Sequence, residues 1–291
     1  MATTSEWLEG ARPRTLPAAI APVAVGTGLA AYGDSLIAAR AALALVVALA
    51  LQIGVNFAND YSDGIKGTDA KRVGPVRLVG QGLAPARTVK LAAFACFGVA
   101  AVAGLVLVVM TGQWWLLLVG SASIAAAWLY TGGPRPYGYA GLGEVFVFVF
   151  FGIVPVVGTA YVQTLTITAV DVVASIGVGL LACAILVTNN LRDIAGDTAA
   201  GKTTLAVRLG DAATRRLYAL IVVLALVVPL VLGLMTSPVV AAASITVVLA
   251  ISPLRVVLGG ALGPALIPAL KQTGILLLVY GLLLGLLIAF A

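Results

Sequence analysis

Histidine is absent from the 291 residues of this chain, and charged residues make up only 10% of it. Without imidazole, the chain has no histidine general base, no histidine ligand for haem and none of the usual zinc sites. Cys96 and Cys183 both lie in long apolar runs, where we expect small buried side chains rather than a disulfide or a metal pair. Because soluble domains carry roughly 25% charge, this composition excludes an ordinary soluble protein.

Apolar residues fill most of the chain instead, with 62% hydrophobic residues and a mean hydropathy of +1.13. A helix that spans a bilayer needs about 20 mostly apolar residues. The sequence predicts an all-α integral membrane protein with nine transmembrane helices in one bundle. No linker divides it, so we expect a single domain over residues 1–291. The nine stretches lie at roughly 16–33, 40–58, 89–111, 113–130, 143–163, 172–190, 217–235, 238–257 and 273–290.

Lysine and arginine are concentrated in alternate loops between these stretches, and Arg40 is the only basic residue in the other loops. The positive-inside rule then predicts a cytoplasmic N-terminus and an outside C-terminus, in the inner (plasma) membrane of the cell. The net charge of +6 reflects this topology, and it favours anionic membrane lipid or an anionic substrate at the inner face. Nucleic acid is not expected as a partner, because the basic residues lie in short loops between spans.

A cluster of amide and carboxylate side chains ends the second predicted span. Asn56, Asn59, Asp60 and Asp63 follow the helical spacing i, i+3, i+4 and i+7, which predicts one shared face. Such residues near the end of a span usually mark function, although helix capping in contact with cytosolic water is the alternative.

A matched cluster ends the sixth predicted span, where Asn190, Asp193 and Asp197 follow the spacing i, i+3 and i+7. Two such clusters favour a shared role over capping. Carboxylate and amide oxygens suit Mg²⁺, which typically takes one or two carboxylates plus substrate phosphate oxygens. Two facing clusters could therefore hold a diphosphate through metal ions at the inner face.

Basic residues in the same two loops are candidates for binding the phosphates: Lys66, Arg72, Arg77 and Lys202. The apolar helices could then house a long hydrocarbon tail. Residues 196–203 also match the P-loop pattern G-x-x-x-x-G-K-[ST]. A true P-loop follows a strand, whereas a predicted membrane helix precedes this one, so we do not expect a nucleotide site.

These motifs resemble those of a known family. Asn59 and Asp60 followed by Asp63, and Asp193 followed by Asp197, resemble the two aspartate-rich motifs of the UbiA-type intramembrane prenyltransferases. The resemblance covers essentially the whole chain. The stretches 12–17, 59–69, 130–136 and 189–193 are most similar to the branch that prenylates 1,4-dihydroxy-2-naphthoate in menaquinone synthesis. Gly67 stands where many members have a further Asp, and Asp69 follows with a spacing similar to that branch.

The resemblance implies a reaction and roles for residues. A polyprenyl diphosphate would lose diphosphate, and the allylic carbon would bond to 1,4-dihydroxy-2-naphthoate, which loses CO2 on the way to demethylmenaquinone. The four motif aspartates would hold Mg²⁺, with metal or phosphate support from Asn56, Asn59 and Asn190. Tyr130 and Arg135 are similar to a family tyrosine and basic residue near the diphosphate and the allylic carbon.

Alternative interpretations remain at this point. Tyr130 could be an interfacial tyrosine, and Arg135 could only set topology. Glu144, near the inner end of the fifth span, is a candidate for the acceptor pocket or for a buried pair with an arginine. For the whole chain, the alternatives are a different aromatic acceptor such as 4-hydroxybenzoate, or a membrane transporter.

Overall fold

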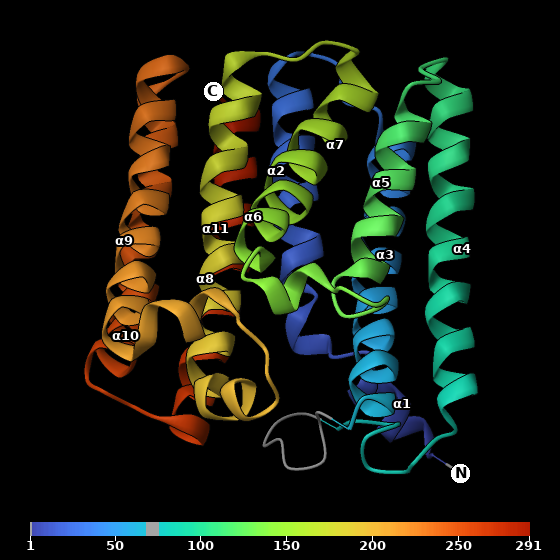
Figure 1. Cartoon of the computed structure of the whole chain (residues 1–291). Helices are drawn as coiled ribbons and strands as arrows, with labels where there is room; N and C mark the ends of the chain where they lie inside the picture. The colour runs from blue at the N-terminus through green and yellow to red at the C-terminus, as the bar shows by residue number, and fades with distance from the viewer. Residues whose placement is uncertain (1, 68–75) are drawn as a thin grey trace.

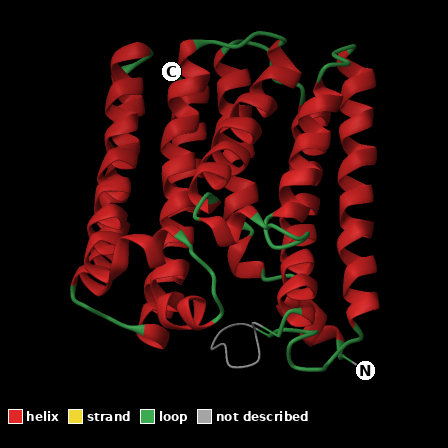
Figure 2. Cartoon of the chain, in the orientation of Figure 1, coloured by secondary structure: helices red, strands yellow, loops and turns green. Residues whose placement is uncertain are grey.

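The computed structural model describes residues 2–67 and 76–291, and over these ranges the chain forms helices and loops without a strand (Figure 2). Arg72 and Asp69, singled out from the sequence, lie outside the described residues. In chain order the helical elements are α1 (Thr4–Gly10), η1 (Pro13–Thr15), α2 (Pro17–Tyr32), α3 (Ala38–Ile65), α4 (Ala86–Thr111), α5 (Leu116–Leu129), η2 (Tyr137–Ala140), α6 (Gly143–Val147), the π-helical turn η3 (Phe148–Ile153), α7 (Val154–Thr164), α8 (Ala169–Ala199), α9 (Leu205–Met235), η4 (Pro238–Thr246), α10 (Val247–Leu258), η5 (Gly263–Leu266) and α11 (Ile267–Ala289).

Seven helical segments of the described chain are long and apolar enough to cross a membrane. An eighth results if Thr4–Thr15 and Pro17–Tyr32, which are bent by 49° at their junction, count as one span. The bend follows Arg12, whose φ of 56° is left-handed, and prolines begin both η1 and α2. The remaining predicted span corresponds to α5, which has only 14 residues. The all-helical membrane fold is confirmed, and the number of nine spans stays a prediction.

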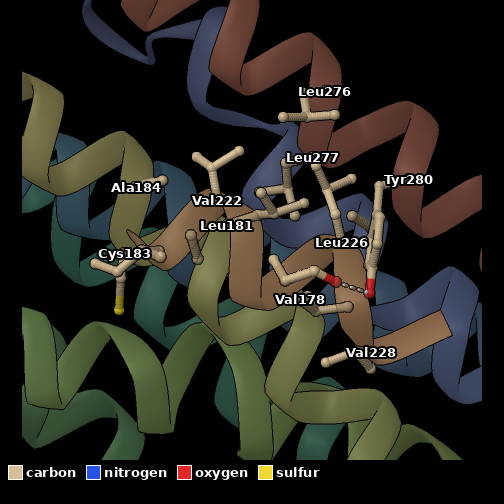
Figure 3. Packing of buried hydrophobic residues seen from close by; sticks show 14 of the residues in the cluster. Val178, Leu181, Cys183, Ala184, Val222, Leu226, Val228, Leu276, Leu277 and Tyr280 are labelled. Carbon is tan, nitrogen blue, oxygen red and sulfur yellow. Dashed lines mark hydrogen bonds between the residues drawn. The ribbon is translucent and has the colours of Figure 1, made fainter. Parts of the chain in front are cut away.

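Helices α8, α9 and α11 form the tightly packed half of the bundle. Figure 3 shows Leu181, Leu226 and Leu277 meeting there, and the buried Tyr280 hydroxyl donates to the Ala225 carbonyl oxygen at 3.0 Å. Helix α2 packs closely on α11, since a Cβ added at Gly28 would lie 2.0 Å from the Gly285 carbonyl oxygen. Contact this close requires small residues, which permit close helix packing in membranes.

The two ends of the bundle differ in chemistry. Figure 1 shows the carboxyl ends of α3 and α8 at the same end as the N-terminus, and the C-terminus at the opposite end. At that opposite end Arg40 donates to the carbonyl oxygens of Val162 (2.9 Å) and Met110 (2.8 Å). These carbonyls belong to the last turns of α7 and α4, whose acceptors have no partner within the helix. Arg40 therefore joins three helix ends.

Helix α5 stops short of the N-terminal end. The loop that follows it turns back above the lower ends of α3 and α4 in Figure 1. It then leads through η2 into α6, and the Gly138 amide donates to the Tyr130 carbonyl oxygen at 3.0 Å. This turn brings residues 131–142 against the ends of α3 and α8, where the polar motifs lie.

Candidate active site

A cavity of about 940 Å³ runs through the looser half of the bundle. Most of its wall is apolar and comes from α3, α4, α5 and α7. On α3 the lining residues extend from Ala44 to Asp63, which is about 28 Å of helix at 1.5 Å per residue. Its polar end includes Asn59, Asp63 and Asp197. The cavity therefore joins a long apolar channel to a polar end.

The first acidic motif does not present all of its members to this cavity. Asn56, Asn59 and Asp63 line it, but Asp60 does not. Asp60 is only 1% exposed and accepts from the backbone amides of Leu78 (2.7 Å) and Val79 (3.2 Å). Asp60 therefore does not reach the cavity, because the loop after residue 75 folds back over α3 and its Leu78 and Val79 amides hold the carboxylate.

The amides of this motif are held by neighbouring segments. Asn56 donates to the Ala11 carbonyl oxygen and to the Thr15 hydroxyl, both at 2.9 Å. Asn59 accepts from the Thr131 hydroxyl at 2.8 Å. The motif is thus tied both to the segment before α2 and to the loop after α5.

Asp63 is the centre of a cluster of charged and aromatic side chains. The Tyr139 hydroxyl donates to Asp63 Oδ1, and the Lys202 ammonium lies 3.3 Å from the same oxygen. Lys66 donates to the Thr131 carbonyl oxygen at 2.7 Å. The ammonium groups of Lys66 and Lys202 lie 4.9 Å and 4.4 Å from the centre of the Tyr139 ring. Burial lowers the pKa of Lys66, Asp63 opposes that shift, and the charge of Lys202 adds to it.

The second motif is arranged differently. Asn190 and Asp197 line the cavity, whereas Asp193 does not and instead pairs with Arg192 at 2.7 Å. Asp193 does not reach the cavity, because the Arg192 guanidinium beside it on α8 holds its carboxylate. Arg192 also donates to Asn189 at 2.8 Å and itself lines the cavity.

Glu144 lies behind the cavity wall, and among the described residues it pairs with Asn190 and not with an arginine. Its Oε1 accepts from the Asn190 amide at 3.0 Å. Its Oε2 is buried without a hydrogen-bond partner among the described residues. Glu144 is buried at the start of α6, which packs against α8. Glu144 therefore contacts the site indirectly, by its hydrogen bond to the cavity-lining Asn190.

A row of aromatic rings lines the cavity near its polar end. Tyr130 meets Tyr137 edge-on at 5.5 Å, Tyr137 stacks on Phe146 at 3.9 Å, and Phe150 follows. Burial, with a smaller contribution from Tyr130, raises the pKa of Tyr137, whose hydroxyl donates to the Ala126 carbonyl oxygen at 2.8 Å. Phe146, Phe150 and Phe151 thus form part of the cavity wall.

The remaining basic candidates lie in different surroundings. Arg77 is 6% exposed and lines the cavity. Arg135 is exposed and outside the lining. Lys202 lies in the loop after α8, and residues 196–203 begin in that helix rather than after a strand, so the nucleotide pattern is only a coincidence of sequence. Tyr139 and Thr131 were missed from the sequence, since no spacing rule links them to Asp63.

The lining of the polar end includes the oxygen donors Asn56, Asn59, Asp63, Asn189, Asn190 and Asp197, beside several basic side chains. Neither cysteine lines the cavity. Among the described residues, no group of three or more histidine, cysteine, aspartate or glutamate side chains is close enough to hold a metal ion. Such a donor set fits Mg²⁺ that is shared with a phosphate group, because Mg²⁺ usually takes one or two carboxylates and completes its shell with phosphate and water.

Comparison with known proteins identifies the family. The UbiA prenyltransferase family model matches residues 19–261. The 1,4-dihydroxy-2-naphthoate octaprenyltransferase of Mycobacterium tuberculosis (strain ATCC 25618 / H37Rv) is 52% identical over 282 residues, covering 97% of this chain and 96% of that protein. The protein of the same name from Escherichia coli (strain K12) is 43% identical over 222 residues, covering 74% of this chain and 72% of that protein.

Solved structures share the fold. A UbiA homologue from Archaeoglobus fulgidus bound to GPP and Mg²⁺ has a TM-score of 0.67 at 14% identity, covering 96% of this chain and 99% of that one. The apo structure of a UbiA homologue from Aeropyrum pernix K1 has a TM-score of 0.72 at 15% identity, covering 94% and 98%. The chain is therefore a multi-pass membrane protein that belongs to the UbiA prenyltransferase family.

Proposed function

We propose that this protein transfers a polyprenyl group from polyprenyl diphosphate to 1,4-dihydroxy-2-naphthoate. The observation that carries the proposal is the 52% identity, over 97% of the chain, to a 1,4-dihydroxy-2-naphthoate octaprenyltransferase. The cavity supports it, since a polar end with lysine, arginine and carboxylate groups suits a diphosphate and the apolar channel suits a prenyl tail.

The reaction begins when the allylic carbon–oxygen bond breaks and the diphosphate leaves with the electron pair. Lys202 and Arg77 place positive charge where negative charge develops on the leaving group. Tyr130, Tyr137 and Phe146 line the cavity, and their aromatic rings would offer electron-rich surface to the allylic cation. The apolar wall keeps water from quenching that cation.

The naphthoate ring then forms the new carbon–carbon bond. Overall the ring gains the prenyl group and loses its carboxylate as CO2, so the product is a prenylated naphthoquinol that two-electron oxidation converts into demethylmenaquinone. Arg135 and Tyr130 stay candidates for the region between the diphosphate and the allylic carbon, on the strength of the family resemblance.

Mg²⁺ is the cofactor that we propose. Asp63 and Asp197 would hold it, with Asn56, Asn59 and Asn190 in support, because these oxygens line the polar end. When bound, Mg²⁺ would neutralise the diphosphate and make it a better leaving group. Asp60 and Asp193 remain proposed Mg²⁺ ligands from the motif resemblance, and in this structure Asp60 accepts from the Leu78 and Val79 amides while Asp193 pairs with Arg192.

We further propose nine spans in one domain, with the N-terminus in the cytoplasm and the polar end of the cavity at the cytoplasmic face of the cell membrane. The basic residues Arg77, Arg192 and Lys202 lie at that end, and Arg40 lies at the other. This distribution agrees with the positive-inside rule.

The test is a transfer assay on the full chain in detergent, with polyprenyl diphosphate and 1,4-dihydroxy-2-naphthoate, in Mg²⁺ or in EDTA. We expect a prenylated, decarboxylated product by mass spectrometry in Mg²⁺ alone. Product only with 4-hydroxybenzoate would keep the prenyl transfer and replace the acceptor. No product with any aromatic acceptor would reject the enzyme and favour the transporter.

A further inference from the structure

Tyr139 lies at the junction of three segments that end in the proposed diphosphate site. It belongs to η2, in the loop that turns back into the bundle after α5. Its backbone carbonyl oxygen accepts from both the amide and the hydroxyl of Thr203, each at 2.9 Å. Thr203 directly follows Lys202, so Tyr139 is attached to the loop between α8 and α9 as well as to the end of α3 through Asp63.

The ring of Tyr139 brings two like charges together. The ammonium groups of Lys66 and Lys202 lie 4.9 Å and 4.4 Å from its centre, within the range of a cation–π contact. Two lysines at one ring repel each other, and a binding site gains from that arrangement only when the ligand carries several negative charges. The ring and the Asp63 carboxylate offset the repulsion before such a ligand arrives.

The hydroxyl of Tyr139 has a second, separable task. It donates to Asp63 Oδ1, the oxygen that also faces the Lys202 ammonium at 3.3 Å. A carboxylate fixed by a hydroxyl donor keeps one orientation toward the cavity. The ring therefore acts on the lysines, and the hydroxyl acts on a carboxylate that we propose as a metal ligand.

We infer that Tyr139 is the positioning residue of the diphosphate end of the site: its ring holds the cavity-lining Lys202 and the exposed Lys66 for the diphosphate, and its hydroxyl orients Asp63 for Mg²⁺. The inference rests on the proposed function, because it assigns the ligand of the two lysines. It gives Tyr139, which neither motif includes, a part in organising residues from α3 and from the α8–α9 loop.

Two substitutions separate the tasks. Tyr139→Phe keeps the ring and removes the hydroxyl, and Tyr139→Leu removes both. Tyr161 provides the matched control: it is a tyrosine at the opposite end of the bundle, where its hydroxyl donates to Gln113 at 3.0 Å, and it does not line the cavity. Tyr161→Phe and Tyr161→Leu therefore remove the same atoms away from the site.

The measurement is calorimetric binding of inorganic pyrophosphate to the full chain in detergent, with and without Mg²⁺. Tyr139→Leu should weaken binding about tenfold in both conditions, because two cation–π contacts are lost. Tyr139→Phe should bind within about twofold of wild type without Mg²⁺ and lose about threefold or more of the gain that Mg²⁺ gives. The Tyr161 variants should bind like wild type.

Equal affinities for wild type and Tyr139→Leu would overturn the inference, as would identical behaviour of Tyr139→Phe and Tyr139→Leu. If Tyr139→Leu does not fold, Tyr139→Phe alone decides, because an unchanged Mg²⁺ response would reject the role of the hydroxyl. Wild-type protein that binds no pyrophosphate and transfers no prenyl group would reject the proposed function together with the inference. Wild-type transfer with unaffected Tyr139 variants would reject the inference alone.

Discussion

The acidic motifs at the ends of α3 and α8 hold their members in different ways. In each, an amide and the acid seven residues later line the cavity, Asn56 with Asp63 and Asn190 with Asp197. The acid between them is directed elsewhere, to backbone amides for Asp60 and to the Arg192 guanidinium for Asp193.

Acids with the same spacing on two helices therefore do not have the same surroundings. A helix fixes which residues share a side, but the neighbouring segments decide which of them reach the cavity. The motif on α3 is covered by the loop at residues 76–85, whereas α8 is covered by α6, which contributes Glu144.

The largest effect should come from the acids that line the cavity in both motifs. Asp63→Asn and Asp197→Asn should each lower kcat by about 100-fold or more, because each removes a negative charge from the proposed metal site. The transfer assay in Mg²⁺ measures this, with the melting temperature as a check on folding. Full activity in either variant would show that this residue does not hold the metal. The two motifs would then not contribute equivalent acids to the site.

The next largest effect should distinguish Asp60 from Asp193, the middle acids of the two motifs. Asp60→Asn places an NH2 group against the Leu78 or Val79 amide, which should cost about 1–3 kcal/mol of unfolding free energy. Hydrogen exchange at these two amides should become faster. Asp193→Asn is the matched change on α8, and it should leave exchange at Leu78 and Val79 unchanged. If the Leu78 and Val79 amides exchanged equally fast in both variants, Asp60 would not hold this loop in the way that the structure indicates.

A smaller effect should follow from the partner of Asn190. Glu144→Leu removes the acceptor of the Asn190 amide and should lower kcat/KM about tenfold, which corresponds to about 1.4 kcal/mol. Glu144→Gln keeps an acceptor oxygen at the same place and should restore most of the activity. A Glu144→Gln variant as impaired as Glu144→Leu would show that the negative charge matters instead of the hydrogen bond.

The smallest effect should come from Thr15 in η1, the corresponding partner of the α3 amide Asn56. Thr15→Val removes a hydroxyl that accepts from Asn56 at 2.9 Å, but Asn56 keeps its bond to the Ala11 carbonyl oxygen. We expect a loss of about 0.5–1.5 kcal/mol in unfolding free energy and an activity within a fewfold of wild type. If Thr15→Val lowered activity more than Glu144→Leu, the orientation of Asn56 would matter more for activity than that of Asn190, contrary to this prediction.

Several features could be predicted from the sequence because they depend on local composition. Long apolar runs can cross a bilayer only as helices or closed barrels, since the backbone must satisfy its own hydrogen bonds there. The runs and the charge distribution therefore predicted the helical membrane class, and the paired motifs predicted which helix ends face one another across the cavity. Helix α5 was predicted as a full span, and its 14 residues show that the count of apolar residues includes loop residues such as Trp114 and Trp115.

Tertiary structure alone decided which polar residues meet. Asp60 depends on a loop 18 residues away, Glu144 on a helix 46 residues away, and Asp63 on Tyr139, 76 residues away. Side-chain spacing within one helix carries no information about such partners, because they are fixed by how α5 ends early and by how the loops fold over α3 and α8. By itself, the sequence determined the class of protein and the candidate acids; the packing of the loops determined which of these acids line the cavity.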